Sequence, residues 1–292
     1  MNEIRLSYLI TTKNKLPYLK QSIQKLIEYK KNDEEILVAD GASTDGTGEF
    51  LQSLKDKGFI TYFISEQDYG EAHGLNKLFL QAKGTLITIV TDDDVFHYET
   101  ISCIKDFMLA HLEIDMTGTE GGFKDQNSLK SVRAMCYEQN YKKWQINHTP
   151  FACCCLGIIF RRSSLPLLGL WNTSYKKLDA EFSLRNTAGK ANIAWYTGHA
   201  YVNISNPQST SIVYMKRIKS ETDCLNKLYF GKNENSFLVE KFKIFKTKLR
   251  NMFFNYSDSD NSKMDWSELV KIAEDWLEKT NKEKRTEFLW NK

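Results

Sequence analysis

The first hundred residues alternate between short apolar runs and amphipathic segments, and this pattern restricts the fold more than any other feature. The runs with the length and composition of strands are residues 4–10, 35–39, 59–64 and 86–91. Helical patterns lie between them, from Pro17, near residues 47–57 and at residues 75–82. Repeated strand–helix alternation is typical of a parallel sheet covered by helices. We therefore predict the α/β class, with a Rossmann-like, mixed and mostly parallel sheet and flanking helices.

The rest of the chain divides into two parts. Residues 113–213 are less regular, and we expect them to complete the sheet and build the second side of the site. From about residue 215 lysine and arginine become dense, and a polar linker at residues 255–262 precedes a last helix near Asp265, where Glu268 completes a capping-box spacing. We predict one domain over residues 1–215 and a C-terminal helical extension over residues 216–292.

Charge and composition exclude several classes of protein. The net charge of +3 argues against a dedicated nucleic-acid binder, so no nucleic-acid partner is expected. The sequence contains no apolar stretch long enough to span a bilayer, and its first residues lack the pattern of a secretory signal. The six cysteines show no disulfide or zinc spacing, which suits buried thiols in a reducing compartment. A cytoplasmic location is expected.

Three consecutive aspartates, Asp92, Asp93 and Asp94, end the apolar run 86–91. Like charges this close repel one another, so a cation is needed unless the segment is a solvated acidic turn. Mg²⁺ and Mn²⁺ are bound by one or two carboxylates together with substrate phosphates. No basic cluster flanks the three aspartates in the sequence. The pattern therefore predicts a divalent-cation site at the carboxyl end of a strand, where open α/β sheets bind ligands.

A second acidic residue, Asp40, ends the strand 35–39 and precedes the loop 41–47, which is rich in glycine, serine and threonine. A carboxylate at this place can accept hydrogen bonds from a base or a ribose, and glycines allow a close approach to a ligand. Asp45 in the same loop suits either ligand binding or a turn and helix cap. No GxGxxG or GxxxxGK[ST] motif follows the first strand, which argues against Rossmann dehydrogenases and P-loop enzymes.

The order of these motifs resembles that of bacterial family 2 glycosyltransferases, which have the GT-A fold. The resemblance covers residues 4–215 and rests on the segments Ile10–Asn14, Val38–Thr47, Ser65–Gly70, Asn76–Lys77 and Thr91–Asp94. It implies an inverting transfer from a nucleotide-sugar donor, with UDP as the first expectation, and Mn²⁺ or Mg²⁺ as cofactor. It also implies a nucleotide-binding half at residues 1–97 and an acceptor and catalytic half at residues 98–215.

By the same resemblance, individual residues acquire expected roles. Thr11, Asp40 and Asp68 would bind the nucleotide part of the donor, together with Asp92 and Asp93, and Asp94 would bind the metal. The register of the acidic motif stays open between Asp93 with Asp94 and Asp92 with Asp94. Arg161 or Arg162, with Arg162 preferred, would neutralise phosphate charge, although both also suit surface ion pairs.

The catalytic base is expected in the segment Lys177–Arg185, which resembles the acidic segment of the family. Asp179 is the first choice and Glu181 the second, because residues two apart on a helix face different directions. The same letters would also suit the first turn of a helix.

The acceptor expected from the resemblance is a glycan or a lipid-linked oligosaccharide in bacterial surface-polysaccharide synthesis. Residues 237–254 have an apolar stripe flanked by lysines, which suits either a peripheral membrane surface or packing on the catalytic domain. The rival functions are a sugar-1-phosphate nucleotidyltransferase and a non-catalytic nucleotide- or glycan-binding module.

Overall fold

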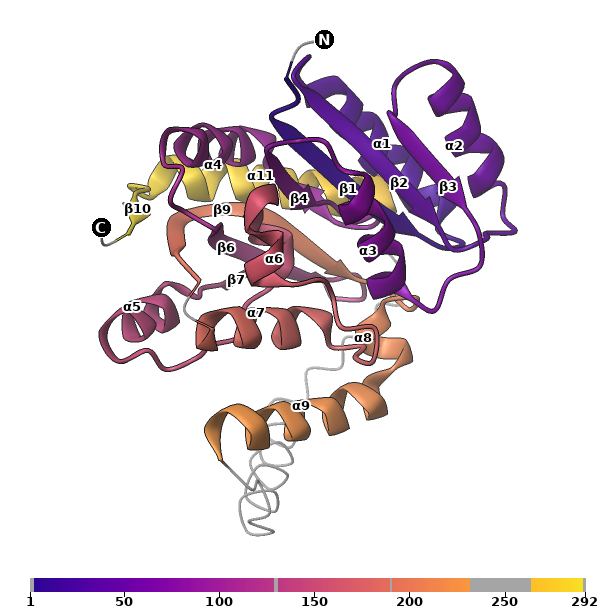
Figure 1. Ribbon diagram of the computed structural model, residues 1–292. Helices are drawn as coiled ribbons and strands as arrows, with labels where there is room; N and C mark the ends of the chain where they lie inside the picture. Colours follow the sequence, from indigo (N-terminus) through magenta and orange to yellow (C-terminus); the bar gives the residue numbers. More distant parts are fainter. Residues whose placement is uncertain (1–2, 129–130, 190, 232–263, 291–292) are drawn as a thin grey trace.

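The computed structural model describes residues 3–128, 131–189, 191–231 and 264–290, and its elements alternate along the N-terminal third as predicted (Figure 1). The strands are β1 Leu6–Thr12, β2 Glu34–Asp40, β3 Tyr62–Ser65, β4 Leu86–Ile89, β5 Val95–Phe96, β6 Met116–Asp125, β7 Arg133–Met135, β8 Ile159–Arg161, β9 Ile193–Ser205 and β10 Phe288–Leu289. The helices are α1 Leu16–Tyr29, α2 Thr47–Asp56, α3 Glu71–Gln81, α4 Tyr98–Ala110, α5 Glu138–Asn147, α6 Leu165–Leu168, α7 Leu178–Ala188, α8 Thr210–Val213, α9 Met215–Phe230 and α11 Trp266–Glu283.

The strands form one mixed sheet in the order β10-β9-β6-β8-β4-β1-β2-β3. Neighbours are parallel from β4 through β1 and β2 to β3, and again between β6 and β9. Strand β8 lies antiparallel between β4 and β6 and joins the two parallel parts. The predicted α/β architecture is therefore present, and the less regular middle of the chain does complete the sheet.

Helices cover both faces of the sheet. The side chains of β1 alternate between the two faces and contact a helix on each. On one face the Thr11 side chain approaches Gly74 of α3. On the other face Tyr8 makes an edge-on contact with Tyr98 of α4, at 6.3 Å between ring centroids. The apolar side chains Leu19, Ile23 and Leu26 of α1 are buried inside the main core.

The C-terminal part returns to the sheet. Helix α11 begins where the sequence predicts, and the carboxylate of its N-cap Asp265 accepts a hydrogen bond from the Ser267 backbone N–H. Its buried side chains Leu269, Ala273 and Leu277 pack with residues of β5 and β9, and β10 then pairs antiparallel with β9 (Figure 1). Helix α11 and strand β10 thus lie against the sheet that residues 1–215 form, whereas the division at residue 215 remains a prediction.

The segment 237–254 lies outside the described residues. Among the residues that are described, no helix is both long enough and apolar enough to cross a bilayer.

Candidate active site

The carboxyl ends of β1, β2 and β4 lie at one edge of the sheet because the three strands are parallel and in register. Thr12 pairs with Asp40, and Leu9 pairs with Ile89. The loops that follow these strands therefore meet at this edge, as expected for a ligand site in an open α/β sheet.

The loop after β2 is fixed by Asp40 and by the loop after β1. The buried Asp40 carboxylate accepts hydrogen bonds from the Ser43 backbone N–H at 3.0 Å, from the Ser43 hydroxyl and from the Ser65 hydroxyl at 2.6 Å. Asn14, at φ 53°, donates its backbone N–H to Ser43 Oγ and accepts from the Thr44 N–H, both at 2.8 Å. Asparagine tolerates this left-handed conformation, so the two loops are joined without a glycine at that position.

Asp45 has a structural role in this loop. Its carboxylate accepts from the backbone N–H of Leu16 at 3.0 Å and of Thr47 at 3.2 Å, and so joins the starts of α1 and α2. Of the two roles suggested by the sequence, the turn and cap interpretation matches these contacts.

Two other predicted nucleotide-binding residues, Thr11 and Asp68, lie close to Asp40. A Cβ built on Gly41 would lie 2.9 Å from Asp68 Oδ2, and one built on Gly74 would lie 2.9 Å from Thr11 Cγ2. Asp68 in turn accepts from the Gly70 backbone N–H at 2.9 Å. The glycines thus allow Thr11, Asp40 and Asp68 to approach one another at the edge of the sheet.

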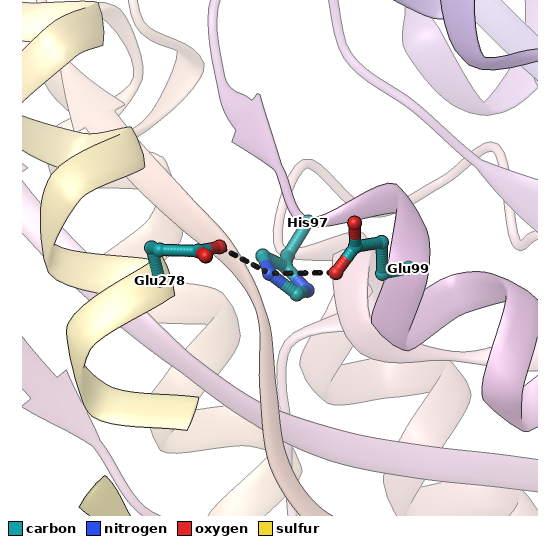
Figure 2. A group of neighbouring side chains, drawn as sticks. All are labelled: His97, Glu99 and Glu278. Atoms are coloured by element: carbon teal, nitrogen blue, oxygen red, sulfur yellow. Dashed lines mark hydrogen bonds and ion pairs between the residues drawn. The ribbon is translucent and has the colours of Figure 1, made fainter. Parts of the chain in front are cut away.

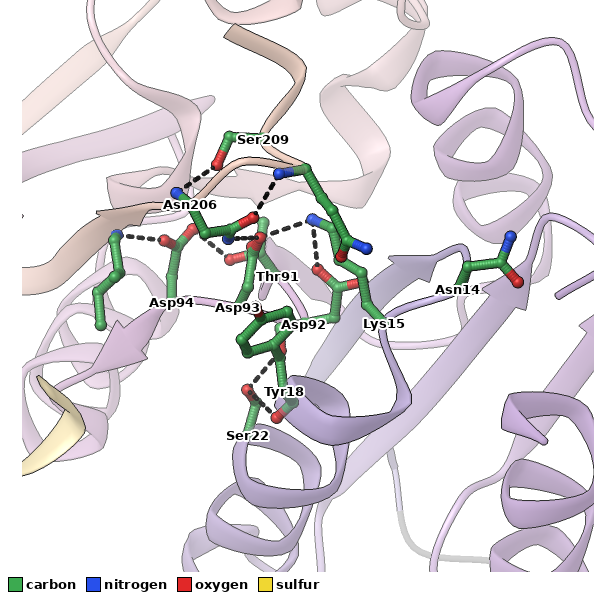
Figure 3. Close-up of polar contacts among 12 residues, drawn as sticks. Asn14, Lys15, Tyr18, Ser22, Thr91, Asp92, Asp93, Asp94, Asn206 and Ser209 are labelled. Atoms are coloured by element: carbon green, nitrogen blue, oxygen red, sulfur yellow. Dashed lines mark hydrogen bonds and ion pairs between the residues drawn. The ribbon is translucent and has the colours of Figure 1, made fainter. Parts of the chain in front are cut away.

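The three aspartates after β4, called the triad below, are all buried (Figure 3). Lys15 from the loop after β1 contacts two of them, with Nζ 3.3 Å from Asp92 Oδ1 and 2.6 Å from Asp93 Oδ2. Asn206, just after β9, donates its side-chain N–H to Asp93 at 2.8 Å. No pattern in the sequence indicates a basic residue here, because Lys15 and the triad become adjacent only through the pairing of β1 with β4.

The charges of the triad are incompletely neutralised. Burial raises the pKa of Asp92 to about 7, and the charge of Asp93 adds to the effect while Lys15 opposes it. Burial and the charge of Asp93 raise the pKa of Asp94 to about 8. Burial would lower the pKa of Lys15, but the charges of Asp92 and Asp93 outweigh it and raise that pKa. When all three carboxyl groups are ionised, the single ammonium of Lys15 leaves excess negative charge, which a divalent cation would balance.

Asp94 differs from its two neighbours because its carboxylate faces β9. Its Oδ1 accepts from the Ile204 backbone N–H at 2.7 Å and the Asn203 side chain at 3.0 Å, while Oδ2 accepts from the Thr91 hydroxyl. That Asp94 binds the metal stays a prediction, because a hydrogen-bonded carboxylate oxygen keeps a lone pair for an ion. Asp93 has two protein partners, Lys15 and Asn206, both on Oδ2.

Asp179 and Glu181 lie at the start of α7 in different surroundings. The buried Glu181 forms a two-point ion pair with Arg185, at 2.9 and 3.2 Å. Asp179 is half-buried beside the cysteine run 153–155. Burial raises its pKa, and hydrogen bonds with Cys154 and Cys155 act in the opposite direction. Of the two candidates, Asp179 has no ion pair with a described residue and is the better proton acceptor.

Arg162 is not part of this site. It follows β8, which runs antiparallel to β4, so Arg161 pairs with Leu86 at the opposite end of that strand. The Arg162 side chain is exposed and donates to the Gly84 carbonyl at 2.9 Å. The buried Arg161 donates to backbone carbonyls of Met108, His111 and Ile114. The expectation that Arg162 contacts donor phosphate is therefore not supported. It depended on the direction of β8, which the sequence does not show.

Glu71, the first residue of α3, is a member of the site that the sequence did not indicate. Burial raises the pKa of its carboxyl group to about 7, and the charges of Asp179, Asp92 and Asp93 contribute while Lys15 opposes them. A glutamate in the first turn of a helix is common, so no pattern in the sequence distinguishes it.

Comparison with known proteins agrees with this geometry. The model of the family described as Glycosyl transferase family 2 matches residues 7–165, which is more than half of the chain. An uncharacterized glycosyltransferase of Mycoplasma genitalium is 27% identical over 110 residues, covering 36% of this chain and 37% of that protein. A GalNAc(5)-diNAcBac-PP-undecaprenol beta-1,3-glucosyltransferase of Campylobacter jejuni is 34% identical over 93 residues, 31% of this chain and 30% of that protein. The chain thus spans about a third of the length of the curated relatives that it matches.

Two solved structures have the same fold over most of the chain. Residues 1–349 of S. aureus TarS, in complex with UDP-GlcNAc, align with a TM-score of 0.56 and 16% identity, covering 91% of this chain and 77% of that one. The mannosyltransferase PcManGT from Pyrobaculum calidifontis, in complex with GDP-Man and Mn²⁺, aligns with a TM-score of 0.56 and 15% identity, covering 92% and 83%. With the GT-A fold shared and the family model matched over residues 7–165, the chain belongs to glycosyl transferase family 2.

Proposed function

We propose that this protein is an inverting, metal-dependent glycosyltransferase that moves a sugar from a nucleotide donor, with UDP as first choice, to a glycan or lipid-linked acceptor. The observation that supports it most is the meeting of buried Asp92 and Asp93 with the Asp40 loop at the carboxyl edge of the sheet. A donor site needs a partner for the nucleoside and a place for the diphosphate, and these two features supply them.

The triad fits a divalent cation such as Mn²⁺ or Mg²⁺. Hard cations take carboxylate oxygens as ligands, and Asp92 and Asp93 offer buried carboxylates with only Lys15 as a nearby positive partner among the described residues. Asp93 would bind the ion, with Asp92 beside it on the ion or the ribose. When bound, the ion would neutralise charge on the diphosphate leaving group.

Thr11, Asp40 and Asp68 would bind the nucleoside. Contacts with Ser43 and Ser65 fix Asp40 at the edge of the sheet, and a contact with Gly70 fixes Asp68 there. A carboxylate that already accepts from loop hydroxyls can exchange one of those hydrogen bonds for a ligand donor at little cost.

Asp179 would act as the general base that removes the proton from the acceptor hydroxyl. A base works best when its pKa is close to the working pH, and burial moves the pKa of Asp179 upward from the ordinary aspartate range. The neighbouring thiols of Cys153, Cys154 and Cys155 remain protonated because burial raises their pKa values, so they add no competing negative charge.

The acceptor class and the setting are proposed from the name of a curated relative. The Campylobacter jejuni relative is named as acting on an undecaprenol-linked glycan, which supports a lipid-linked acceptor and surface-polysaccharide synthesis. A lipid-linked acceptor would favour membrane proximity, and we propose peripheral membrane association through residues 237–254. That segment lies outside the described residues. The division into residues 1–215 and an extension from residue 216 is likewise proposed.

The test is calorimetric titration with UDP, GDP and dTDP, with and without Mn²⁺. We expect one nucleotide to bind only with the metal, and Asp93→Ala to weaken that binding at least tenfold. Asp93 is chosen because removal of Asp94 would leave the donors on Asn203 and Ile204 unpaired. The matched control is Asp106→Ala, an exposed aspartate on α4. Absence of binding to all three nucleotides by a folded protein would contradict the proposal.

A further inference from the structure

The first turn of α3 lies against the segment that leads into α7. The side chain of Asn76 exchanges two hydrogen bonds with the backbone of Trp171, donating to its carbonyl and accepting from its N–H, both at 2.9 Å. A Cβ built on Gly70 would lie only 2.5 Å from Nζ of Lys176. These contacts fix Glu71, the residue after Gly70, near the start of α7, where Asp179 is located.

Glu71 lies within the electrostatic field of both functional groups of the site. The charges of Asp179, Asp92 and Asp93 all act on its carboxyl group, and the charge of Lys15 opposes them. Its carboxylate has no hydrogen bond or ion pair with any residue in the described part of the chain. Glu71 is half-buried, and a partly desolvated carboxylate without a partner is costly, so this group is suited to accept hydrogen bonds from a ligand.

In the proposed reaction, the transferred sugar must lie between the diphosphate near Asp92 and Asp93 and the acceptor oxygen near Asp179. Glu71 is influenced by both ends of this space. We propose that Glu71 accepts hydrogen bonds from hydroxyl groups of the transferred sugar and thereby selects the donor sugar; this inference rests on the proposed function.

The chemistry of the two groups agrees. An ionised carboxylate is only an acceptor, with two oxygens, and a sugar ring presents hydroxyl donors. A buried acceptor discriminates strongly against a ligand that lacks the matching hydroxyl, because the acceptor is then left unpaired. Glu71 would therefore contribute to the affinity for the sugar and not to the affinity for the nucleotide.

The experiment compares each nucleotide with its own sugar derivative, by titration in Mn²⁺ of UDP against UDP-N-acetylglucosamine and of GDP against GDP-mannose. For the pair that the wild type binds best, Glu71→Ala should weaken nucleotide-sugar binding about tenfold. Binding of the nucleoside diphosphate should stay within about threefold, since its contacts are elsewhere. Glu71→Gln, which retains an oxygen acceptor, should lose less than Glu71→Ala.

Glu49→Ala is the matched control, because Glu49 is also in the first turn of a helix but is exposed on α2. It should leave both affinities unchanged. Equal losses for nucleotide and nucleotide sugar in Glu71→Ala, or no loss for either, would overturn the inference. A wild type that binds neither nucleotide nor nucleotide sugar would instead overturn the proposed function, and this inference with it. Thermal unfolding of each variant separates these results from misfolding.

Discussion

Two groups of ionisable side chains begin at neighbouring positions of the chain and differ in burial and in the compensation of their charges. Only Val95 and Phe96 separate Asp94, the last residue of the triad, from His97. His97, Glu99 and Glu278 form the second group, called the His97 group, whose ligand-type atoms lie within 4.8 Å of one another. Both groups therefore bring carboxylates close together. They differ in how deeply the carboxylates are buried and in how far nearby groups compensate their charge.

The His97 group is open to solvent and satisfied by its own contacts (Figure 2). His97 Nε2 lies 3.4 Å from Glu278 and 4.0 Å from Glu99, and both glutamates are largely exposed. Nδ1 accepts from the Thr100 backbone N–H at 3.2 Å, which leaves the proton of a neutral ring on Nε2, facing Glu278. Hydrogen bonds from Lys282 and His97 lower the pKa of Glu278. This group joins α4 to α11, and its Nε2 has no lone pair free for a metal.

The triad has the opposite properties. Its carboxylates are buried, and two of the three have pKa values of about 7 and 8 because burial disfavours their charge. The comparison teaches that a functional acidic site is recognised by uncompensated charge in a buried place, and not by the number of carboxylates.

The largest effect is expected for Asp179→Asn, which removes the proposed base without changing its shape. The turnover number should fall between 10²- and 10⁴-fold, the range for a general base, while nucleotide affinity stays the same. Because the folded-state pKa of Asp179 is raised, wild-type activity should decline as the pH falls through that pKa, above the ordinary aspartate value of about 3.9. Steady-state rates across pH with a competent acceptor measure both effects; a rate within threefold of wild type would exclude Asp179 as the base.

A smaller but substantial effect is expected for Lys15→Met, which removes the cation shared by Asp92 and Asp93. Without added metal at neutral pH, the free energy of unfolding should fall by about 3 kcal/mol, as when one partner of a buried pair is lost. At pH 5 the loss should be smaller, since a carboxyl group with a raised pKa is then protonated and needs no cation. Mn²⁺ should restore part of the stability at neutral pH.

Denaturant unfolding at pH 5 and pH 7.5 measures this prediction, with Lys25→Met as the control. Lys25 forms an ion pair with Glu274 at 3.0 Å, but both side chains are more than a third exposed, so its loss should cost about 1 kcal/mol or less. Equal losses for the two variants at neutral pH would show that the triad is no different from a surface ion pair.

The sequence was sufficient to predict the parts of the site that follow from local pattern. Strand–helix alternation predicted the parallel strands, and Asp40 and the triad were found because polar residues at strand ends interrupt apolar runs. The sequence could not predict which other residues lie near the triad, because only strand order brings them there. These residues are Lys15, Asn206 and Glu71. Arg162 was misplaced for a related reason, since the antiparallel direction of β8 depends on packing that no local pattern encodes. The return of α11 and β10 to the sheet also depends on tertiary packing and could not be predicted from local pattern.

The smallest effect is expected for Glu278→Gln in the His97 group. The variant keeps a hydrogen-bonding side chain and loses only an exposed charge, so the free energy of unfolding should change by less than about 1 kcal/mol. Nucleotide affinity in Mn²⁺ should be unchanged, because this group has no place in the donor site. Calorimetric titration with Mn²⁺ alone provides the sharper measurement: the stoichiometry should be the same in Glu278→Gln and the wild type and should fall in Asp93→Ala. A reduced stoichiometry in Glu278→Gln would show that exposed carboxylates with ion-pair partners also bind metal in this protein. It would remove the distinction between the two groups.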